Sequence, residues 1–374
     1  MQINSGFGIG DSRTVAVPAQ SGSDTDNQTV TTAPQQAAQK IFKISDGPVT
    51  TATLVQTSYP TTTMARFVLQ ENGHAFDLVL DSAGAIPRAL SNTTIPGAMR
   101  GIWADGGWSA ILQYLDAGVV KSVFLGFPAA TTTGSAPVRI KFLPDNIGDV
   151  AASPSGKNIV YIVPNAAGSD AYLTKPDGTD GKKLFSLPMK ELLISWPAAN
   201  TQLLWTKSDS GVAGAAFSVN ASTGGVVPLL YAPGLTVNAD RLFVHVVYQN
   251  TTVSGASSFV HDMGTGNDTA ISFDPIPEKC IWSNIATTTM YCAVPLAYAS
   301  TNYLDLWHQG AASMEDSILS FNVESGTSNV VTVPGGEEGG VATDIAEMAV
   351  SQDDRYLVFI KKGDRSLWGV RLTQ

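Results

Sequence analysis

Apolar residues along the chain come in short runs rich in Val, Ile, Phe, Tyr and Thr, and clusters of Gly, Pro, Asn, Asp and Ser separate these runs. Some runs alternate apolar and polar positions, as in Phe76–Leu80 and Phe321–Glu324. This pattern predicts many short β-strands joined by tight turns. It leaves no stretch for a long helix.

A strand followed by a Gly-containing turn recurs along the chain. The first residues of these strands are Phe76, Phe124, Tyr172, Phe217, Phe259, Phe321 and Leu367. Successive positions are 48, 48, 45, 42, 62 and 46 residues apart. A period of about 40–50 residues with four strands per unit is typical of a β-propeller. We therefore expect an all-β fold, a seven-bladed β-propeller.

One hairpin recurs closely in two of the units. Residues 151–162 and 349–360 align without a gap, each as a small-residue strand, a polar turn and a β-branched or aromatic strand. The hairpin resembles the Ser-Pro-Asp-Gly-Lys hairpin of TolB-type and WD-like propeller blades, with departures at Ser155, Gln352 and Asp353. The resemblance implies the propeller fold.

The two ends of the repeat region complement each other. The last unit has predicted strands at 344–351, 356–361 and 366–372 but lacks a fourth, outer strand. Residues 40–44 are predicted to form a strand that belongs to none of the repeat units. Pairing the two would close the ring and cover an exposed edge. We expect one propeller domain over residues 40–374. Residues 1–39 have no apolar period and are expected to be a flexible tail or tether.

Several further sequence segments bear on the cellular location of the protein. They are Ile44–Pro48, Ser91–Pro96, Lys279–Trp282, Tyr291–Pro295 and Trp307–Gly310. These runs resemble those of uncharacterised extracytoplasmic propeller proteins from candidate-phyla bacteria. The resemblance implies a secreted or cell-surface location and brings no activity with it. The chain shows no basic and apolar signal segment, so either a signal has been removed or the protein stays inside the cell.

The two cysteines, Cys280 and Cys292, flank a segment that reads as strand, turn, strand. If the turn centres near Ala286, the cysteines face each other across an antiparallel hairpin, where Cβ atoms about 4.5–5.5 Å apart permit a disulfide. Two cysteines in register are the pattern that an oxidising compartment leaves. The alternative is a pair of buried free thiols.

Composition narrows the class of partner. The formal charge is −10, and 14% of residues are charged, against roughly 25% in an ordinary soluble domain. The 22 basic residues do not cluster, so nucleic acid is not an expected partner. No window approaches the ~20 consecutive apolar residues of a transmembrane segment.

The sixth unit is the longest, and its excess lies at 296–316, between its second and third strands. Insertions in repeat folds lie on a loop face, which is often the binding face. The insertion carries four large amphipathic side chains of the kind that anchor ligands: Tyr298, Tyr303, Trp307 and His308. The competing interpretation is that these side chains hold the insertion against its blade.

Other polar groups are expected to be structural. The four histidines, His74, His245, His261 and His308, match no metal-binding spacing, and no G-x-S-x-G nucleophile turn is present. Asp177, Asp180 and Asp209 lie in turns, where Asp hydrogen-bonds the local backbone. Glu337 and Glu338 read as a solvated loop. Asp24–Asn27 has only part of a calcium-loop pattern. We expect no cofactor and no metal.

Five Asn-x-Ser/Thr tripeptides occur, at Asn27, Asn92, Asn220, Asn250 and Asn267. They are glycosylated only in a host with that machinery.

The function that these observations favour is a non-catalytic, extracytoplasmic binding module, whose rigid ring presents loops to a protein or glycan. Two alternatives stay open. One is a carbohydrate-active enzyme with its site at the channel mouth. The other is a structural subunit of a cell-surface assembly.

Overall fold

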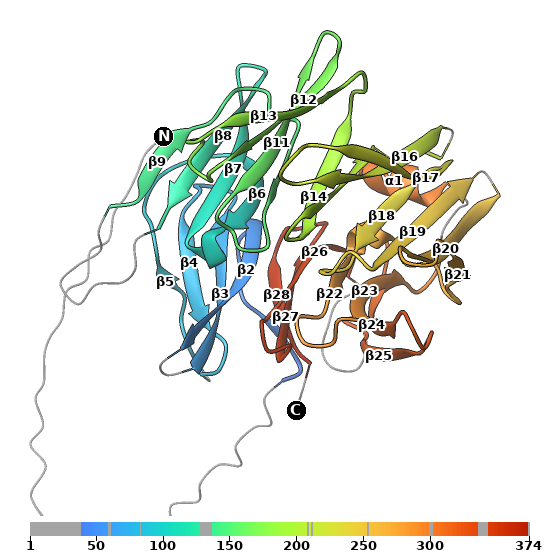
Figure 1. Cartoon of the computed structure of the whole chain (residues 1–374). Helices are drawn as coiled ribbons and strands as arrows, with labels where there is room; N and C mark the ends of the chain where they lie inside the picture. Colours follow the sequence, from blue (N-terminus) through green and yellow to red (C-terminus); the bar gives the residue numbers. More distant parts are fainter. Residues whose placement is uncertain are drawn as a thin grey trace, which may run out of the picture. The chain divides into compact units, whose positions relative to one another are not determined.

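The computed structural model describes residues 39–58, 61–82, 84–127, 137–207, 209–210, 212–252, 254–298, 302–335 and 343–372. The expected tail at 1–39 lies outside these residues except for Gln39, as do Asp24–Asn27, Glu337 and Glu338. Within them, the strands form seven four-stranded antiparallel sheets, which are the blades of a β-propeller (Figure 1). The predicted fold class and number of blades are confirmed.

The first four blades follow one another along the chain. Blade 1 contains β2 (Val49–Ser58), β3 (Thr61–Leu69), β4 (Ala75–Val79) and β5 (Arg88–Ala89). Blade 2 contains β6 (Ala98–Ala104), β7 (Ser109–Asp116), β8 (Val119–Gly126) and β9 (Arg139–Phe142). Blade 3 contains β10 (Asp149–Ala152), β11 (Ile159–Asn165), β12 (Gly168–Thr174) and β13 (Lys182–Leu187). Blade 4 contains β14 (Leu192–Ala198), β15 (Thr201–Thr206), β16 (Ala213–Asn220) and β17 (Val226–Pro233).

The remaining blades complete the ring. Blade 5 contains β18 (Thr236–Ala239), β19 (His245–Thr252), β20 (Gly255–Asp262) and β21 (Asp268–Ala270). Blade 6 contains β22 (Cys280–Trp282), β23 (Thr289–Pro295), β24 (Asp316–Asn322) and β25 (Ser328–Thr332). Blade 7 contains β26 (Ile345–Val350), β27 (Tyr356–Lys361), β28 (Leu367–Arg371) and β1 (Ile41–Lys43). Among the described residues, three short helices interrupt the strands: η1 (Asp105–Gly107), η2 (Pro277–Lys279) and α1 (Tyr303–His308).

Blade 7 is built from both ends of the propeller, as the sequence predicts. In Figure 1 the first described segment, in blue, reaches the red strands of blade 7. β1 pairs antiparallel with β28, with Phe42 opposite Gly369. A Cβ atom at Gly369 would lie 2.5 Å from the Phe42 ring, so only glycine leaves room for the end of this ring over β28. The pairing covers the edge that β28 would otherwise expose.

The hydrophobic core is divided among the junctions between blades. Seven clusters of buried residues each draw on two adjacent blades, and together they go round the ring. Blades 7 and 1 share one of them, in which Val358 packs with Val49 and Phe67. Each blade therefore buries both of its faces against neighbours, which is how a small four-stranded sheet removes its apolar surface from water.

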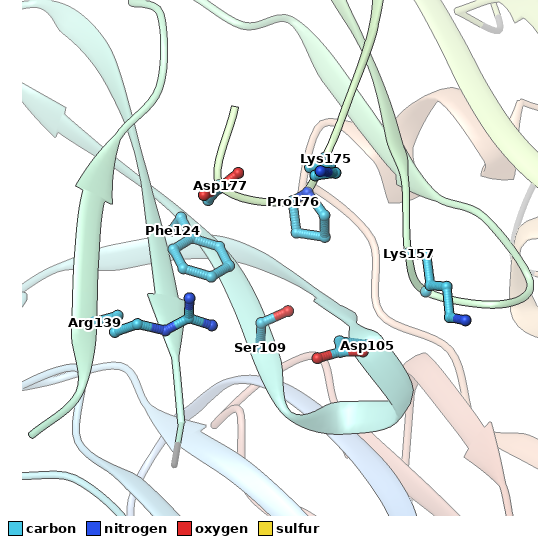
Figure 2. Close-up of a pocket in the computed structure, with 9 residues that line it drawn as sticks. Asp105, Ser109, Phe124, Arg139, Lys157, Lys175, Pro176 and Asp177 are labelled. Carbon is cyan, nitrogen blue, oxygen red and sulfur yellow. The ribbon is translucent and has the colours of Figure 1, made fainter. Parts of the chain in front are cut away.

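The turns between first and second strands also join neighbouring blades. In blade 3 this turn contains Gly156, whose φ is +69° and whose Cβ, if present, would lie 2.2 Å from the backbone nitrogen of Asp105. The Asp105 N–H donates to the Gly156 carbonyl at 3.0 Å. The two turns thus touch through their backbones, and a pocket opens beside them (Figure 2). None of the helices in the described part of the chain is long and apolar enough to cross a membrane.

Candidate functional site

The predicted insertion forms the connection between β23 and β24, and its central segment folds into α1. Tyr303, Leu304 and Trp307 are buried, and their spacing places them on one face of this helix. Gly310, with φ at +72°, ends the helix, and its N–H donates to the Trp307 carbonyl at 3.1 Å. The short helix therefore turns an apolar face towards the propeller.

Polar side chains tie α1 to parts of the ring that are far apart in the sequence. The Asp305 carboxylate accepts a hydrogen bond from the Ser210 backbone N–H at 3.0 Å and another from the Ser210 hydroxyl. The Tyr303 hydroxyl donates to Gln249 Oε1 at 3.1 Å. Ser210 follows β15 in blade 4, and Gln249 lies in β19 of blade 5. The insertion of blade 6 is thus held by two preceding blades.

A buried cluster of charges holds the other side of α1. Lys279 Nζ lies 2.6 Å from Asp316 Oδ2 and 3.0 Å from Asp344 Oδ1, and all three side chains are almost fully buried. The Trp307 indole N–H donates to both oxygens of Asp344, at 2.9 and 3.1 Å. The cluster connects α1 to the start of β24 and to the segment before β26.

Lys362, from the turn between β27 and β28, completes this cluster. Its Nζ lies 4.2 Å from the centroid of the Trp307 ring and donates to the Trp307 carbonyl. Burial lowers the pKa of Lys362, and burial also raises the pKa of Asp316, although Lys279 opposes that rise. The insertion therefore contacts blades 4, 5 and 7 in addition to its own.

The two tyrosine rings of the insertion pack against each other at a tilt of 31°. The ring centroids of Tyr298 and Tyr303 are 4.3 Å apart. The Tyr298 hydroxyl donates to the backbone carbonyl of Asp274, in the segment between blades 5 and 6. Burial raises the pKa of both tyrosine hydroxyls and of the Asp274 carboxyl, so the tyrosines stay neutral hydrogen-bonding groups at physiological pH.

A polar pocket of about 380 Å³ opens between α1 and blade 4. Its lining residues are Glu191, Lys207, Asp209, Asp305, His308 and Gln309. His308 Nε2 lies 2.8 Å from Glu278 Oε2, and both side chains are about one-fifth exposed. Carboxylates outnumber cations in this lining, so the pocket suits a ligand that donates hydrogen bonds.

The structure separates the four predicted binding residues into two groups. Tyr303 is 4% exposed and Trp307 7% exposed, so their side chains hold the insertion in place. Tyr298 is 36% exposed and His308 lines the pocket. A binding role for the four stays a prediction, in which Tyr303 and Trp307 act by positioning the other two.

Sequence reasoning missed the charged residues beneath α1. Lys279, Asp316 and Asp344 lie up to 65 residues apart, and each directly precedes or begins a strand. A signal was present, because a lone charge beside an apolar strand is unusual unless it is paired. The sequence does not show which charges meet.

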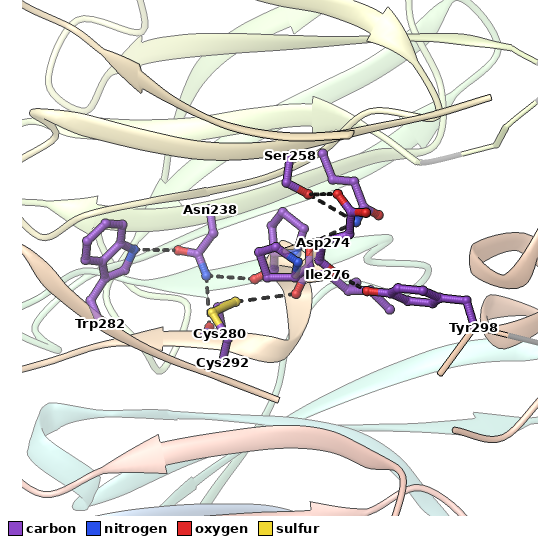
Figure 3. Close-up of a disulfide and its surroundings, with 11 residues drawn as sticks. Asn238, Ser258, Asp274, Ile276, Cys280, Trp282, Cys292 and Tyr298 are labelled. Atoms are coloured by element: carbon purple, nitrogen blue, oxygen red, sulfur yellow. Dashed lines mark hydrogen bonds between the residues drawn. A yellow bond between two sulfur atoms is a disulfide. The ribbon is translucent and has the colours of Figure 1, made fainter. Parts of the chain in front are cut away.

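The cysteines are paired, as predicted. Cys280 lies directly opposite Cys292 in the β22–β23 ladder, and a disulfide joins them. Figure 3 shows Asn238 beside this bond: its amide donates to the Cys280 carbonyl at 2.9 Å, and its oxygen accepts the Trp282 indole N–H at 3.0 Å. The disulfide and Asn238 thus fix the inner strand of blade 6 below the insertion.

The other histidines and the turn aspartates have local partners. His245 Nδ1 lies 2.9 Å from Asp240, and His261 Nδ1 lies 2.8 Å from Asp268. Asp177 accepts hydrogen bonds from the backbone and hydroxyl of Thr179, as expected for a turn residue. Among the described residues, no group of three or more His, Cys, Asp or Glu side chains is arranged to hold a metal ion.

Comparisons with known proteins find similarity in structure but not in sequence. No model of a protein family matches the chain, and no curated protein matches it. An oligogalacturonate lyase in complex with manganese superposes on 89% of this chain and 93% of its own, with a TM-score of 0.61 and 12% identity. The Pan2 WD40 domain from Neurospora crassa covers 90% of this chain and 98% of its own, with a TM-score of 0.53 and 12% identity.

TolB from Acinetobacter baumannii is also similar, over 77% of this chain and 64% of that protein, with a TM-score of 0.46 and 10% identity. The first two likenesses confirm the expected WD-like propeller fold. The resemblance to propellers of candidate-phyla bacteria finds no support in these comparisons.

Proposed function

We propose that the chain is an extracytoplasmic binding module and that the insertion at 296–316 forms its binding face. The observation that carries the proposal is the way α1 is held: contacts to blades 4, 5 and 7 fix a helix of only six residues beside a polar pocket. A rigid pocket loses little conformational entropy on binding. The disulfide supports a location in an oxidising compartment.

The pocket favours a partner that presents hydrogen-bond donors. Glu191, Asp209 and Asp305 contribute carboxylates, and Lys207 and His308 are the basic groups of the lining. Such a surface accepts hydrogen bonds from glycan hydroxyls or from the lysine ammonium groups of a protein. Tyr298, partly exposed beside the helix, adds an aromatic surface of the kind that binding sites use.

Glycan arrays and affinity capture with the full chain test this function. The variants Glu191→Gln and Gln309→Ala change pocket side chains without removing a contact that holds α1, so they should weaken capture and leave the thermal unfolding temperature unchanged. Arg241→Ala, an exposed residue in the β18–β19 turn at the other end of the blades, is the matched control. Capture that is equal in all variants would contradict the proposal.

A catalytic function at the same place is the second candidate. The observation in its favour is the Glu278–His308 pair, 2.8 Å apart at the edge of the pocket, because a carboxylate that orients a histidine is a common general-base arrangement. Two similar structures are those of oligogalacturonate lyases, but at 12% and 8% identity this likeness is one of fold. If the wild type cleaves oligosaccharides and releases a product, and His308→Ala does not, this candidate is favoured over binding alone.

A further inference from the structure

A second pocket, of about 300 Å³, lies between blades 2 and 3 (Figure 2). Its walls come from η1 after β6, from β8 and β9, and from the turns that follow β10 and β12. The insertion instead follows β23, the second strand of its blade. Because successive strands of a blade run in opposite directions, the turn after a first strand and the turn after a second strand lie at opposite ends of the propeller. The two pockets are therefore separate sites.

Ser109 gives the first sign that this pocket takes a ligand. Its side chain is 2% exposed, and its hydroxyl oxygen has no hydrogen-bond partner among the described residues. Buried hydroxyls in native proteins are nearly always paired. Figure 2 shows Ser109 between Arg139 and Asp105 in the lining of the pocket. A ligand atom in the pocket would supply the missing partner.

Arg139 and Lys157 give the second sign. The Arg139 guanidinium extends from β9 into the pocket and lies 5.8 Å from the centroid of the Phe124 ring. In the part of the chain that the structure describes, neither Arg139 nor Lys157 forms an ion pair with a carboxylate. Two unpaired cations in one pocket are notable in a chain with a net charge of −10.

The remaining charged groups of the pocket are two carboxylates and one paired lysine. Lys175 pairs with Asp180 at 2.5 Å, and Asp177 is engaged by Thr179, whose hydroxyl and backbone N–H lower the Asp177 pKa. Asp177 stays charged, and Arg139 is among the cations that also lower its pKa. Asp105 is the one lining carboxylate without a side-chain partner in the described residues. Arg139 and Lys157 thus face the carboxylates of Asp105 and Asp177, and this mixed lining suits a ligand that combines a single carboxylate with hydrogen-bond donors.

We propose that this pocket binds small carboxylic acids that carry hydroxyl groups beside the carboxylate. Arg139 pairs with the ligand carboxylate through its planar fork of N–H donors, and the Ser109 hydroxyl donates to the same group. Asp105 accepts a hydrogen bond from a neighbouring ligand hydroxyl. A phosphate dianion would meet the Asp105 carboxylate, so the pocket disfavours it.

Saturation-transfer NMR on the full chain, with sodium D-glucuronate as the probe, tests the proposal. Glucuronate should bind, whereas acetate, which has no hydroxyls, and D-glucose, which has no charge, should each bind about tenfold more weakly. Inorganic phosphate should not compete. The absence of a glucuronate signal, equal binding of acetate, or displacement by phosphate would each overturn the proposed ligand class.

Two pocket variants and one control locate the site. Arg139→Gln should weaken glucuronate binding by about tenfold or more, and Arg241→Gln, which changes an exposed arginine in the β18–β19 turn, should leave it unchanged. Asp105→Asn keeps a side chain that tolerates the local φ of +51° and should reduce the preference for glucuronate over acetate.

Thermal unfolding of each variant distinguishes lost binding from lost structure. Should Arg139→Gln fail to fold, Ser109→Ala gives the same test, because it removes the hydroxyl with little change in volume. Wild-type affinity in a folded Arg139 or Ser109 variant would overturn the proposal. Glycan capture at the insertion is a separate measurement, so the two proposals fail independently.

Discussion

Among single residues, we expect those with buried charges to affect the stability of this propeller most. Lys279 has two carboxylate partners and almost no contact with water. Such a cluster is costly to desolvate, and its members depend on one another because removal of one leaves the others without compensation. Lys279, at the end of η2, thus joins blade 6 to blade 7 through its two carboxylate partners.

Lys279→Met keeps a long side chain and removes the charge. We expect it to lower the free energy of unfolding by about 3–5 kcal/mol, since two buried carboxylates lose their counter-ion. Urea denaturation measures the change. Lys121→Met, which breaks an exposed pair with Asp145, is the control and should cost far less, because solvent screens such a pair. A Lys279 variant as stable as the control would show that the cluster contributes little.

Asp353 makes the propeller sensitive to acid. Burial alone would raise its pKa, but hydrogen bonds from Arg355, Ser351 and Gln56 outweigh burial and lower the pKa to about 2, from an ordinary value of 3.8. The folded state therefore favours the charged form. Its stabilising effect is complete above pH 3.8 and is lost as the pH falls through about 2.

The variant Asp353→Asn separates this effect from general acid unfolding. Near neutral pH the wild type should be the more stable protein, and the difference should shrink between pH 3.8 and about 2. Urea unfolding at a series of pH values gives both curves. A difference that stays constant down to pH 2 would mean that Asp353 does not titrate in this range.

Among the elements, α1 depends most on its surroundings. Six residues are too few for an isolated helix in water. Its stability must come from the burial of Tyr303, Leu304 and Trp307 and from the hydrogen bonds to Ser210, Gln249 and Asp344.

Replacement of Trp307 tests this dependence. Trp307→Ala should lower the free energy of unfolding by about 3–5 kcal/mol through the cavity that it leaves. Trp307→Phe keeps a ring but removes the donor to Asp344, and should cost about 1–3 kcal/mol. Hydrogen exchange of the α1 amides should accelerate in the same order. Exchange that is unchanged in the Ala variant would contradict the role given to Trp307.

The elements show what the sequence can predict. Strands such as β26, β27 and β28 follow from local alternation, and the disulfide follows from two cysteines equally far from a turn. The docking of α1 does not, because Ser210, Gln249 and Asp344 come from three different blades and carry no local pattern. The four aromatic and histidine positions were identified, but pattern alone cannot separate buried Trp307 from partly exposed Tyr298.

At the scale of the whole molecule, the feature that matters is closure by β1. Three residues of β1 cover β28, whose residues Trp368, Gly369 and Val370 are otherwise the edge of the last blade. An uncovered edge strand is a template for pairing with another chain.

Deletion of residues 1–44 removes β1, and deletion of residues 1–38 is the matched control that keeps it. Compared with the control, the longer deletion should unfold at lower temperature and form oligomers through β28. Differential scanning calorimetry and light scattering measure the two effects. A longer deletion as stable and as monomeric as its control would show that β1 is dispensable.

Closure also sets the order of events during synthesis. In the described part of the chain β1 is synthesised before the strands of blade 1, but β28 follows it by more than 320 residues. Six blades are therefore complete before the first strand finds its partner, and until then both it and the growing sheet have a free edge. Contacts so distant in sequence form slowly. The interval just before the ring closes is thus when this chain is most exposed to pairing with its neighbours on other ribosomes.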